Sequence, residues 1–309
     1  MKKNIYIVGA GAIGRALAVL LELEGAPVTL LRGSADDLPA YSEQLQVLLE
    51  NWDEKNAEIG ISTISHFNEL NGIVVIASKS YGNRRLAQLL ANKTGSSPIV
   101  ILQNGLNVEQ PFIDGGFSEI YRCVLFVTSQ VMNNGKVRFK PVSASPIGIV
   151  KGDETGLQAV VESLNSPHFG FRAENDIRTV IWRKAVINCV FNSVCPLLET
   201  DNGIFHRNGE ALAIARRVIA ECIGIAALQG ITLQAAEVEE NLLQISRSSD
   251  GQQISTLQDI LHKRETEIDT LNAEIARIAA SLGKENEVTE TRLLGGLTAL
   301  KSALNRQKI

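Results

Sequence analysis

The stretch Ile5-Tyr6-Ile7-Val8-Gly9-Ala10-Gly11-Ala12-Ile13-Gly14 opens the chain and decides the fold of its first half. Four apolar residues lead directly into glycines spaced Gly-x-Gly-x-x-Gly. Glycines at this spacing permit a tight turn, a close approach of the backbone to a phosphate and close packing of the following helix, whose first N–H groups attract anions. Alone the motif is a weak signal, but here it follows a strand and opens a helix. We therefore expect a dinucleotide pyrophosphate at Gly9, Ala10, Gly11, Ala12, Ile13 and Gly14.

Short apolar runs alternate with helical segments in the first third of the chain, which predicts a parallel, doubly wound sheet of the Rossmann type. Residues 33–60 interrupt this alternation, because Asp36-Asp37-Leu38-Pro39 breaks the pattern and Gln44–Leu49 fits a strand or a helix equally well. The predicted strands are 4–8, Val28–Leu31, Ile73–Ala77 and Ile99–Leu102, and the predicted helices run from Ala12 to about Glu24 and from about Asn83.

The second half of the chain has a different pattern. Asn133-Asn134-Gly135 predicts a hairpin turn between strands Val124–Val131 and Lys136–Phe139, which extend the sheet. Residues 177–304 then read as successive helices separated by turn signals. A chain of 309 residues is long enough for two cores. We expect a Rossmann-type domain over residues 1–173 and an all-helical domain over residues 174–309.

The composition is that of a soluble globular protein, with 45% hydrophobic and 21% charged residues. A net charge of -4 provides no basic field for nucleic acid, and no segment has the length and apolar character of a membrane span. The four cysteines lack CxxC spacing and the four histidines lack ligand spacing, so we expect buried thiols and no metal site. These features favour a cytoplasmic protein with small-molecule partners.

The residue after the second predicted strand bears on the choice of dinucleotide. NAD-binding versions of this motif usually place an acidic residue there to bind the ribose 2′-hydroxyl, whereas this chain has Arg32. A cation at that point suits a 2′-phosphate. The acids Asp36 and Asp37 lie farther on, where they fit a loop or a helix start. The sequence therefore favours NADP over NAD.

The predicted helix Ile177–Leu198 carries a polar stripe in apolar surroundings. Lys184, Asn188 and Asn192 are four residues apart, so they share one face over roughly 12 Å. A buried polar group without a partner costs about 1–3 kcal/mol, which favours contact with a polar ligand such as a small polyol acid. The alternative is a surface lysine beside two asparagines bonded to their own helix. Pro196 either kinks or ends this helix.

An ordered set of motifs along the whole chain resembles the ketopantoate reductase (2-dehydropantoate 2-reductase) family. The motifs are Gly9–Gly14 with Arg32, Ser78-Lys79-Ser80-Tyr81, Leu102-Gln103-Asn104-Gly105, Trp182-Arg183-Lys184 followed by Asn188 and Asn192, Asn202-Gly203, Ser255-Thr256-Leu257-Gln258-Asp259 and Thr266-Glu267-Ile268-Asp269.

The resemblance implies NADPH-dependent reduction of 2-dehydropantoate to pantoate, a step of pantothenate synthesis. It implies that Lys184 is the proton donor and that Glu267 is the acid beside cofactor and substrate. It assigns NADP binding to Gly9, Gly11, Gly14, Arg32 and Lys79, the meeting point of nicotinamide and substrate to Asn104, and substrate binding to Asn188, Asn192, Asn202 and Ser255.

The chain also departs from the family pattern. Ile254-Ser255-Thr256 stands where the family often has Ser-Ser-Met, Asn107 and Ala273 stand where it has glycines, and Glu290 stands where it has proline. Changes beside Ser255 keep a second hypothesis open, a reductase of another branched 2-keto acid. A third hypothesis is a non-catalytic NADP-binding sensor. The apolar stretches Leu212–Leu228 and Arg292–Leu304 fit core or a homodimer contact, and core is the simpler interpretation.

Overall fold

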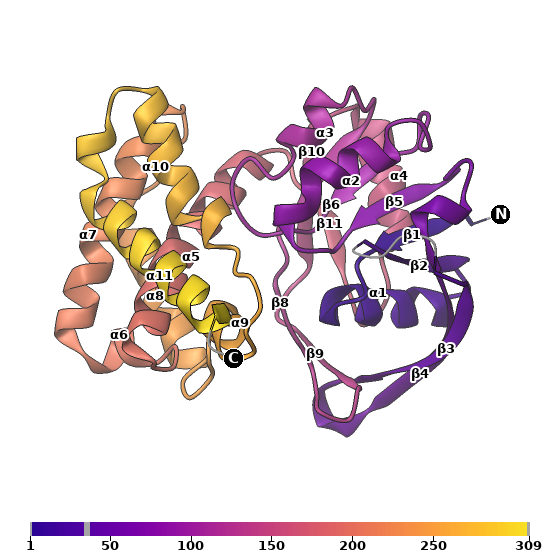
Figure 1. Ribbon diagram of the computed structural model, residues 1–309, viewed down its shortest axis with the longest axis horizontal. Helices are drawn as coiled ribbons and strands as arrows, with labels where there is room; N and C mark the ends of the chain where they lie inside the picture. The colour runs from indigo at the N-terminus through magenta and orange to yellow at the C-terminus, as the bar shows by residue number, and fades with distance from the viewer. Residues whose placement is uncertain (1, 34–37, 308–309) are drawn as a thin grey trace. The chain divides into compact units, whose positions relative to one another are not determined.

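The computed structural model describes residues 2–33 and 38–307, which form two compact units (Figure 1). Unit 1 contains the chain up to Gln103 together with Val108–Ile177, and unit 2 contains Asn104–Asn107 together with the chain from Arg178 onward. The expected functional division after residue 173 stays a prediction, because compactness alone assigns no role to either unit.

Unit 1 is built on one sheet, which has 11 strands in the described residues. The strands are β1 Ile5–Val8, β2 Val28–Arg32, β3 Tyr41–Leu48, β4 Glu54–Thr63, β5 Ile73–Ile76, β6 Ile99–Ile101, β7 Ile120–Cys123, β8 Val127–Val131, β9 Val137–Pro141, β10 Ser145–Lys151 and β11 Phe171–Ala173. Their order is β11-β10-β7-β6-β5-β1-β2-β4-β3-β9-β8.

The centre of this sheet confirms the predicted parallel, doubly wound fold. The strands from β7 to β4 are parallel to their neighbours in that run. The chain leaves β1 toward β2 on one side and later toward β5 on the other, with Ile5 in register with Val28 and with Ile73. Parallel sheets of this kind bind ligands outside the carboxyl ends of the strands at such a switch point.

Both faces of the sheet are buried, which explains why its central strands are continuously apolar. Successive side chains of β1 point to opposite faces, so Ile5 and Ile7 belong to one core while Tyr6 and Val8 belong to the other. The first core is covered by α1 (Ala12–Leu23) and α4 (Glu154–Leu164), and the second by α2 (Asn83–Leu90) and α3 (Gln110–Asp114).

The segment that the sequence left open contains a hairpin. The ambiguous Gln44–Leu49 region lies mostly in β3, which pairs with β4 in antiparallel register from Tyr41 opposite Ile61 to Leu48 opposite Glu54. Alternate residues Leu45 and Val47 are buried, so the strand period prevails over the helical one. Asp36 and Asp37 lie outside the described residues.

The predicted hairpin at Asn133-Asn134-Gly135 is confirmed. Strands β8 and β9 pair in antiparallel register up to Val131 opposite Val137, and Gly135 has a φ of +82°, which favours glycine. Strand β9 also pairs in parallel with β3, so this hairpin extends the sheet beyond the edge that β3 forms.

Unit 2 is all-helical in the described residues, as predicted. Glycines at positive φ follow α7 and α10 at Gly230 and Gly283, in agreement with the turn signals. Pro196 lies inside α5, which continues for two residues to Leu198. The helices are α5 Ile177–Leu198, α6 Ile204–Arg207, α7 Gly209–Leu228, α8 Ala235–Ser248, α9 Ser255–Leu261, α10 Asn272–Ser281 and α11 Thr289–Gln307.

All four cysteines are buried and free of disulfides, as expected from their spacing. Burial raises the pKa of Cys195 to about 12. Within the described ranges, no helix combines the length and apolar character that a membrane crossing requires.

Candidate functional site

The turn between β1 and α1 explains each glycine of the motif separately. Gly9 has a φ of +119°, and a Cβ there would lie 2.5 Å from the backbone nitrogen of Ser78. A Cβ on Gly14 would collide with the carbonyl oxygen of Gly9, so the third glycine lets α1 pack on the end of β1. A Cβ on Gly11 would meet nothing within 4 Å, and Gly11 is exposed.

The open space at Gly11 fits an anionic ligand. Gly11 caps α1 without a side-chain hydrogen bond, and the first turn of the helix contains no acidic residue. The first N–H groups of a helix have no intrahelical acceptor and carry partial positive charge. The N–H groups of Ala12, Ile13 and Gly14 are therefore suited to an anion such as a pyrophosphate, so the dinucleotide expected from the sequence fits these residues.

Arg32 ends β2 beside an aromatic ring that the sequence did not suggest. Its guanidinium carbon lies 4.8 Å from the centre of the Tyr41 ring, and one terminal nitrogen is 3.4 Å from the carbonyl oxygen of Pro39. In the described part of the chain, the buried Nε of Arg32 has no hydrogen-bond partner. A guanidinium that is held in place while keeping donors available suits a phosphate.

Lys79 follows β5 in a loop that buried amides hold in place. Asn83 Nδ2 donates to Gln103 Oε1 over 2.7 Å, and Gln103 Nε2 donates to Asn83 Oδ1 over 2.8 Å and to the carbonyl oxygen of Ser78 over 2.9 Å. These bonds tie the loop after β5 to the loop after β6. Lys79 itself is half-buried.

Asn104 and Glu267 belong to adjoining segments of unit 2. The backbone nitrogen of Leu106 donates to the carbonyl oxygen of Thr270 over 2.9 Å, and the nitrogen of Thr270 donates to the carbonyl oxygen of Glu267 over 3.1 Å. Gly105 has a φ of +104° and packs directly on Thr270. Two residues that are far apart in the sequence are thus joined through one short turn, and both are half-buried.

One polar group of the stripe on α5 is already paired, by a hydrogen bond from α9. Lys184 and Asn188 are half-buried and Asn192 is 4% exposed. Thr256 Oγ1 donates to Asn192 Oδ1 over 2.7 Å, and Asn192 Nδ2 donates to the carbonyl oxygen of Asn188 over 3.1 Å. The second N–H of this amide is the group that Asn192 has left to offer a ligand.

Ser255 adjoins this hydrogen bond, since it is the first residue of α9 and precedes Thr256. It is exposed, whereas Thr256 is 3% exposed. The bond between Thr256 and Asn192 therefore brings the start of α9 to the polar stripe of α5. Two predicted substrate-binding segments come together in unit 2 by this contact.

The backbone of Asn202 is fixed by hydrogen bonds, and its side-chain oxygen is available to a ligand. Its N–H donates to the carbonyl oxygen of Gln252 over 2.9 Å, and its carbonyl oxygen accepts from Ser246 Oγ over 2.7 Å. The residue is 6% exposed, and its Oδ1 has no hydrogen-bond partner among the described residues. An unsatisfied buried acceptor is unfavourable, so it suits a ligand that donates a hydrogen bond.

A charged cluster fixes the turn that contains Asn202. Arg207 bonds Asp201 Oδ1 over 2.7 Å and Asp250 Oδ1 over 2.5 Å, and Asp201 Oδ1 also accepts from the nitrogen of Gly203 over 2.7 Å. The hydrogen bond from Arg207 is the main cause of a pKa of Asp201 below its usual 3.8; burial opposes the shift, and the N–H groups of Gly203 and Gly251 contribute to it.

The sequence interpretation missed Thr256 and Tyr41. Thr256 belongs to the Ser255–Asp259 motif and to the departures from the family pattern, but its threonine identity carries no signal that it would bond an asparagine 64 residues away. Tyr41 lies in the segment that was left open. In the described residues, no three His, Cys, Asp or Glu side chains form a group suited to a metal ion.

The fold and these two groups of residues define a class: a Rossmann-type unit whose glycine-rich turn suits a dinucleotide, followed by a helical unit with a polar stripe. The chain belongs to the ketopantoate reductase PanE/ApbA family. The model of that family matches residues 5–151, and the model of its C-terminal region matches residues 176–294.

Individual relatives agree with the family. A 2-dehydropantoate 2-reductase of Pyrococcus abyssi is 27% identical over 99% of this chain and 100% of its own. The solved structure of D-mandelate dehydrogenase with NADH and anilino(oxo)acetate superposes with a TM-score of 0.84 at 21% identity, covering 99% of this chain and 100% of that one. A dimeric ketopantoate reductase from Staphylococcus aureus gives 0.80 at 16% identity, covering 98% and 99%.

The pKa of Asp201 predicts a pH dependence of the stability of unit 2. A carboxyl whose pKa is lowered by folding stabilises the fold fully above its unfolded pKa, about 4, and this contribution is lost as the pH falls through the folded value. In a Trp52→Phe background, the fluorescence of the buried Trp182 reports on unit 2. As the pH is lowered below about 4, the urea concentration at the unfolding midpoint of unit 2 should fall less steeply in Arg207→Gln than in the parent. Asp201→Asn should behave like Arg207→Gln, and an unchanged slope in both variants would remove this pair as the cause.

Proposed function

We propose that this protein is an NADPH-dependent 2-dehydropantoate 2-reductase that reduces the 2-keto group of 2-dehydropantoate to the hydroxyl of pantoate. The main support is the match of both family models, which together extend over most of the chain and include the predicted cofactor and substrate residues. The name of the Pyrococcus abyssi relative, which aligns from end to end, agrees with this reaction.

The proposed cofactor is NADP, bound by unit 1. The exposed Gly11 and the N-terminus of α1 suit the pyrophosphate, and Arg32 suits the 2′-phosphate because its guanidinium is held over Tyr41. Lys79 adds a second cation after β5. When bound, the reduced nicotinamide supplies the hydride that adds to the ketone carbon.

In this proposal Lys184 is the general acid. Negative charge develops on the ketone oxygen as the carbon is reduced, and an ammonium group stabilises that charge and donates the proton that completes the hydroxyl. Glu267 is the acidic residue beside cofactor and substrate, and Asn104 adjoins its turn through the contact of Gly105 with Thr270.

The asparagines position the substrate without adding charge. Because Thr256 occupies Oδ1 of Asn192, the amide of Asn192 presents an N–H donor, which suits a carboxylate, carbonyl or hydroxyl oxygen. Asn202 presents an acceptor, which suits a substrate hydroxyl. Asn188 and the exposed hydroxyl of Ser255 complete the proposed set. A substrate with both a carboxylate and a hydroxyl matches this combination.

A second candidate is a reductase of another branched 2-keto acid. Ile254 and Thr256 replace family residues on both sides of Ser255, and a bond from Thr256 fixes the neighbouring amide. The same fold is found in a D-mandelate dehydrogenase with NADH, so the fold by itself does not determine which acid is the substrate. The non-catalytic sensor is a third candidate, and measurable turnover would exclude it. The cytoplasmic location stays a prediction of the sequence.

The test of the function is NADPH oxidation by the purified protein with 2-dehydropantoate and a panel of branched and aromatic 2-keto acids. We expect the highest kcat/KM for 2-dehydropantoate. A higher kcat/KM for another acid would make that acid the substrate, and the reaction would still be the reduction of a 2-keto group. No turnover with any acid, despite NADPH binding, would support the non-catalytic sensor.

Lys184→Ala should lower kcat by about 10²–10⁴-fold, the usual contribution of a positioned general acid, because the ketone oxygen loses its proton donor. The dissociation constant for NADPH, measured by nucleotide fluorescence, should stay within about twofold of the parent, because Lys184 acts on the substrate. Lys284→Ala, at a surface lysine of the same unit, is the control and should keep full kcat. Unchanged turnover in Lys184→Ala would remove this lysine from the mechanism.

Arg32→Ala should weaken NADPH binding far more than NADH binding, because only the first cofactor carries a 2′-phosphate. Loss of one charge-assisted contact of about 1.5–3 kcal/mol predicts roughly a 10- to 100-fold rise in the dissociation constant for NADPH. The exposed Arg138 of the same unit provides the control Arg138→Ala. Equal losses for the two cofactors would contradict the choice of NADP.

Thr256→Val removes one hydroxyl while preserving shape, so the amide of Asn192 becomes free to rotate. We expect KM for the keto acid to rise about 5- to 10-fold, the equivalent of one hydrogen bond of about 1 kcal/mol, with little change in NADPH binding. Thr256→Ser should restore the parent value. A fall in melting temperature with an unchanged KM would show that Thr256 only stabilises the fold.

A further inference from the structure

A buried hydroxyl on α8 supports the turn that carries Asn202. Ser246 is fully buried, and its Oγ donates to the carbonyl oxygen of Asn202 over 2.7 Å. The same Oγ accepts from the backbone nitrogen of His206 over 3.3 Å and lies 3.0 Å from Nδ1 of the His206 ring. Ser246 therefore joins α6, which contains His206, to the turn that follows α5.

The chemistry of a hydroxyl fixes the direction of these three bonds. A serine hydroxyl has one proton and two lone pairs, so it donates once and accepts twice. A carbonyl oxygen cannot donate, so the proton of Ser246 belongs to the bond with Asn202. A proton directed at the histidine ring instead would leave a buried carbonyl without this donor, which is unfavourable. Both nitrogens of His206 must then donate to Ser246, and the ring carries a proton on Nδ1.

The second ring nitrogen of His206 faces a carboxylate that is already paired. Asp250 Oδ2 lies 3.9 Å from Nε2 of His206, while Arg207 bonds Asp250 Oδ1 over 2.5 Å. A Cβ on Gly203 would collide with this carboxylate, which explains why a glycine stands where Asp250 approaches the turn. The ring of His206 therefore has Ser246 beside one nitrogen and Asp250 beside the other.

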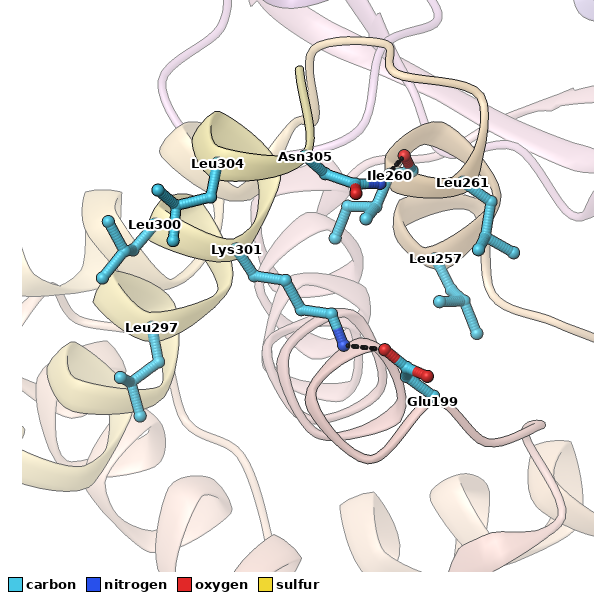
Figure 2. A pocket seen from close by; sticks show the side chains of 9 residues that line it. All are labelled: Glu199, Leu257, Ile260, Leu261, Leu297, Leu300, Lys301, Leu304 and Asn305. Carbon is cyan, nitrogen blue, oxygen red and sulfur yellow. Dashed lines mark hydrogen bonds and ion pairs between the residues drawn. The ribbon is translucent and has the colours of Figure 1, made fainter. Parts of the chain in front are cut away.

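The start of the same turn is fixed by α11. Lys301 Nζ donates to the carbonyl oxygen of Pro196 over 2.6 Å and to Glu199 Oε1 over 2.9 Å, and Figure 2 shows the second of these bonds. A groove of about 330 Å³ adjoins this pair, but leucines of α9 and α11 line most of it and Asn202 does not. The turn is thus anchored at its start by α11 and at Asn202 by α8.

We propose that Ser246 and His206 are positioning residues for Asn202, and that they make the site selective for a 2-keto acid that carries a hydroxyl group. This role rests on the proposed function, in which Asn202 Oδ1 accepts from the substrate hydroxyl. Ser246 fixes the peptide that follows Asn202 through its carbonyl oxygen, and Gln252 fixes the peptide before it through its N–H. The backbone of Asn202 is restrained on both sides, which directs its side chain.

His206 acts on Asn202 through Ser246. A serine hydroxyl on a helix can rotate about its Cβ–Oγ bond and donate to a carbonyl oxygen of the preceding turn instead. Two N–H donors from His206 occupy the lone pairs of Ser246, so its proton is left pointing at Asn202. Because neither residue touches the substrate in this scheme, a change at either affects recognition of the hydroxyl without removing the hydride or the proton donor.

The first test compares 2-dehydropantoate with the analogue that has a methyl group in place of the hydroxymethyl group. Ser246→Ala should lower kcat/KM for 2-dehydropantoate about 5- to 10-fold, mainly through KM, because one directed hydrogen bond is weakened. The value for the analogue should stay within about twofold, because the analogue has no hydroxyl for Asn202 to accept from. Ser248→Ala, at an exposed serine of the same helix, is the matched control and should change neither value.

The second test separates the donor on the His206 ring from the bulk of the ring. In His206→Asn the side-chain amide places an N–H at the position of Nδ1, whereas His206→Leu places a methyl group there. We expect His206→Leu to lower kcat/KM for 2-dehydropantoate about 3- to 5-fold and His206→Asn to restore it to within about twofold of the parent. An equal loss in both variants would contradict the donor role. Trp182 fluorescence checks that each variant is folded.

The third test observes the proton itself and needs no substrate. The chain has four histidines, so nitrogen-15 labelling of histidine gives few ring signals, and His206→Asn identifies those of His206 by their loss. At about pH 8, where an ordinary histidine is neutral, we expect Nδ1 of His206 to show the chemical shift of a protonated ring nitrogen. An unprotonated Nδ1 would overturn the assigned direction of the bonds and the positioning role with it.

The kinetic outcomes separate this role from the proposed function. An equal loss of kcat/KM for both acids in Ser246→Ala would show that Ser246 only stabilises the fold. An unchanged value for 2-dehydropantoate would show that Asn202 does not need Ser246. Either result would overturn the positioning role and leave the reductase activity intact, whereas a parent protein that binds NADPH and reduces neither acid would overturn the proposed function.

Discussion

The close approach of α1 to the end of β1 is the constraint on which unit 1 depends. Gly14 permits it, because any Cβ at that position would collide with the carbonyl oxygen of Gly9. The approach holds the positive N-terminus of the helix at the switch point of the sheet, where Gly11 faces open space. Gly9 in turn allows the loop after β5 to lie against the same turn. A side chain at either position would move the N-terminus of α1 away from the strand ends that support it.

Unit 2 depends on a different kind of constraint, the orientation of buried amides. Asn192 is fixed by Thr256 and by the carbonyl oxygen of its own helix, while Asn202 is fixed through its backbone by Gln252 and Ser246. The partners come from α8, α9 and the loop between them, which all lie far along the chain from α5. The result is one amide donor on the polar stripe of α5 and one amide acceptor in the turn after α5, each with a defined direction. Amide groups held in this way can select a ligand by the arrangement of its oxygens and hydroxyls.

Family, fold and substrate constrain the protein to different degrees. The fold as a whole is shared with a ketopantoate reductase from Staphylococcus aureus and with D-mandelate dehydrogenase. The residues around Ser255 differ from the usual family pattern, and one of them bonds a predicted substrate-binding asparagine. In the proposed function, selection among 2-keto acids would depend on side chains at the start of α9 more than on the fold. The exposed leucines of α11 lie outside these constraints, because the helix packs on its unit by its face of small residues.

The sequence by itself determined the parallel sheet, the helical second half, the hairpin at Gly135 and the family, since each depends on local periodicity, turn residues or motif spacing. It left Gln44–Leu49 undecided, because strand and helix periods agree equally well over so short a run. Only the tertiary structure decided that Thr256 bonds Asn192, that Tyr41 lies beside Arg32 and that the leucines of α11 face outward. These features depend on which elements become neighbours, and amphipathic spacing says that a helix has two faces without saying which face its own unit will bury.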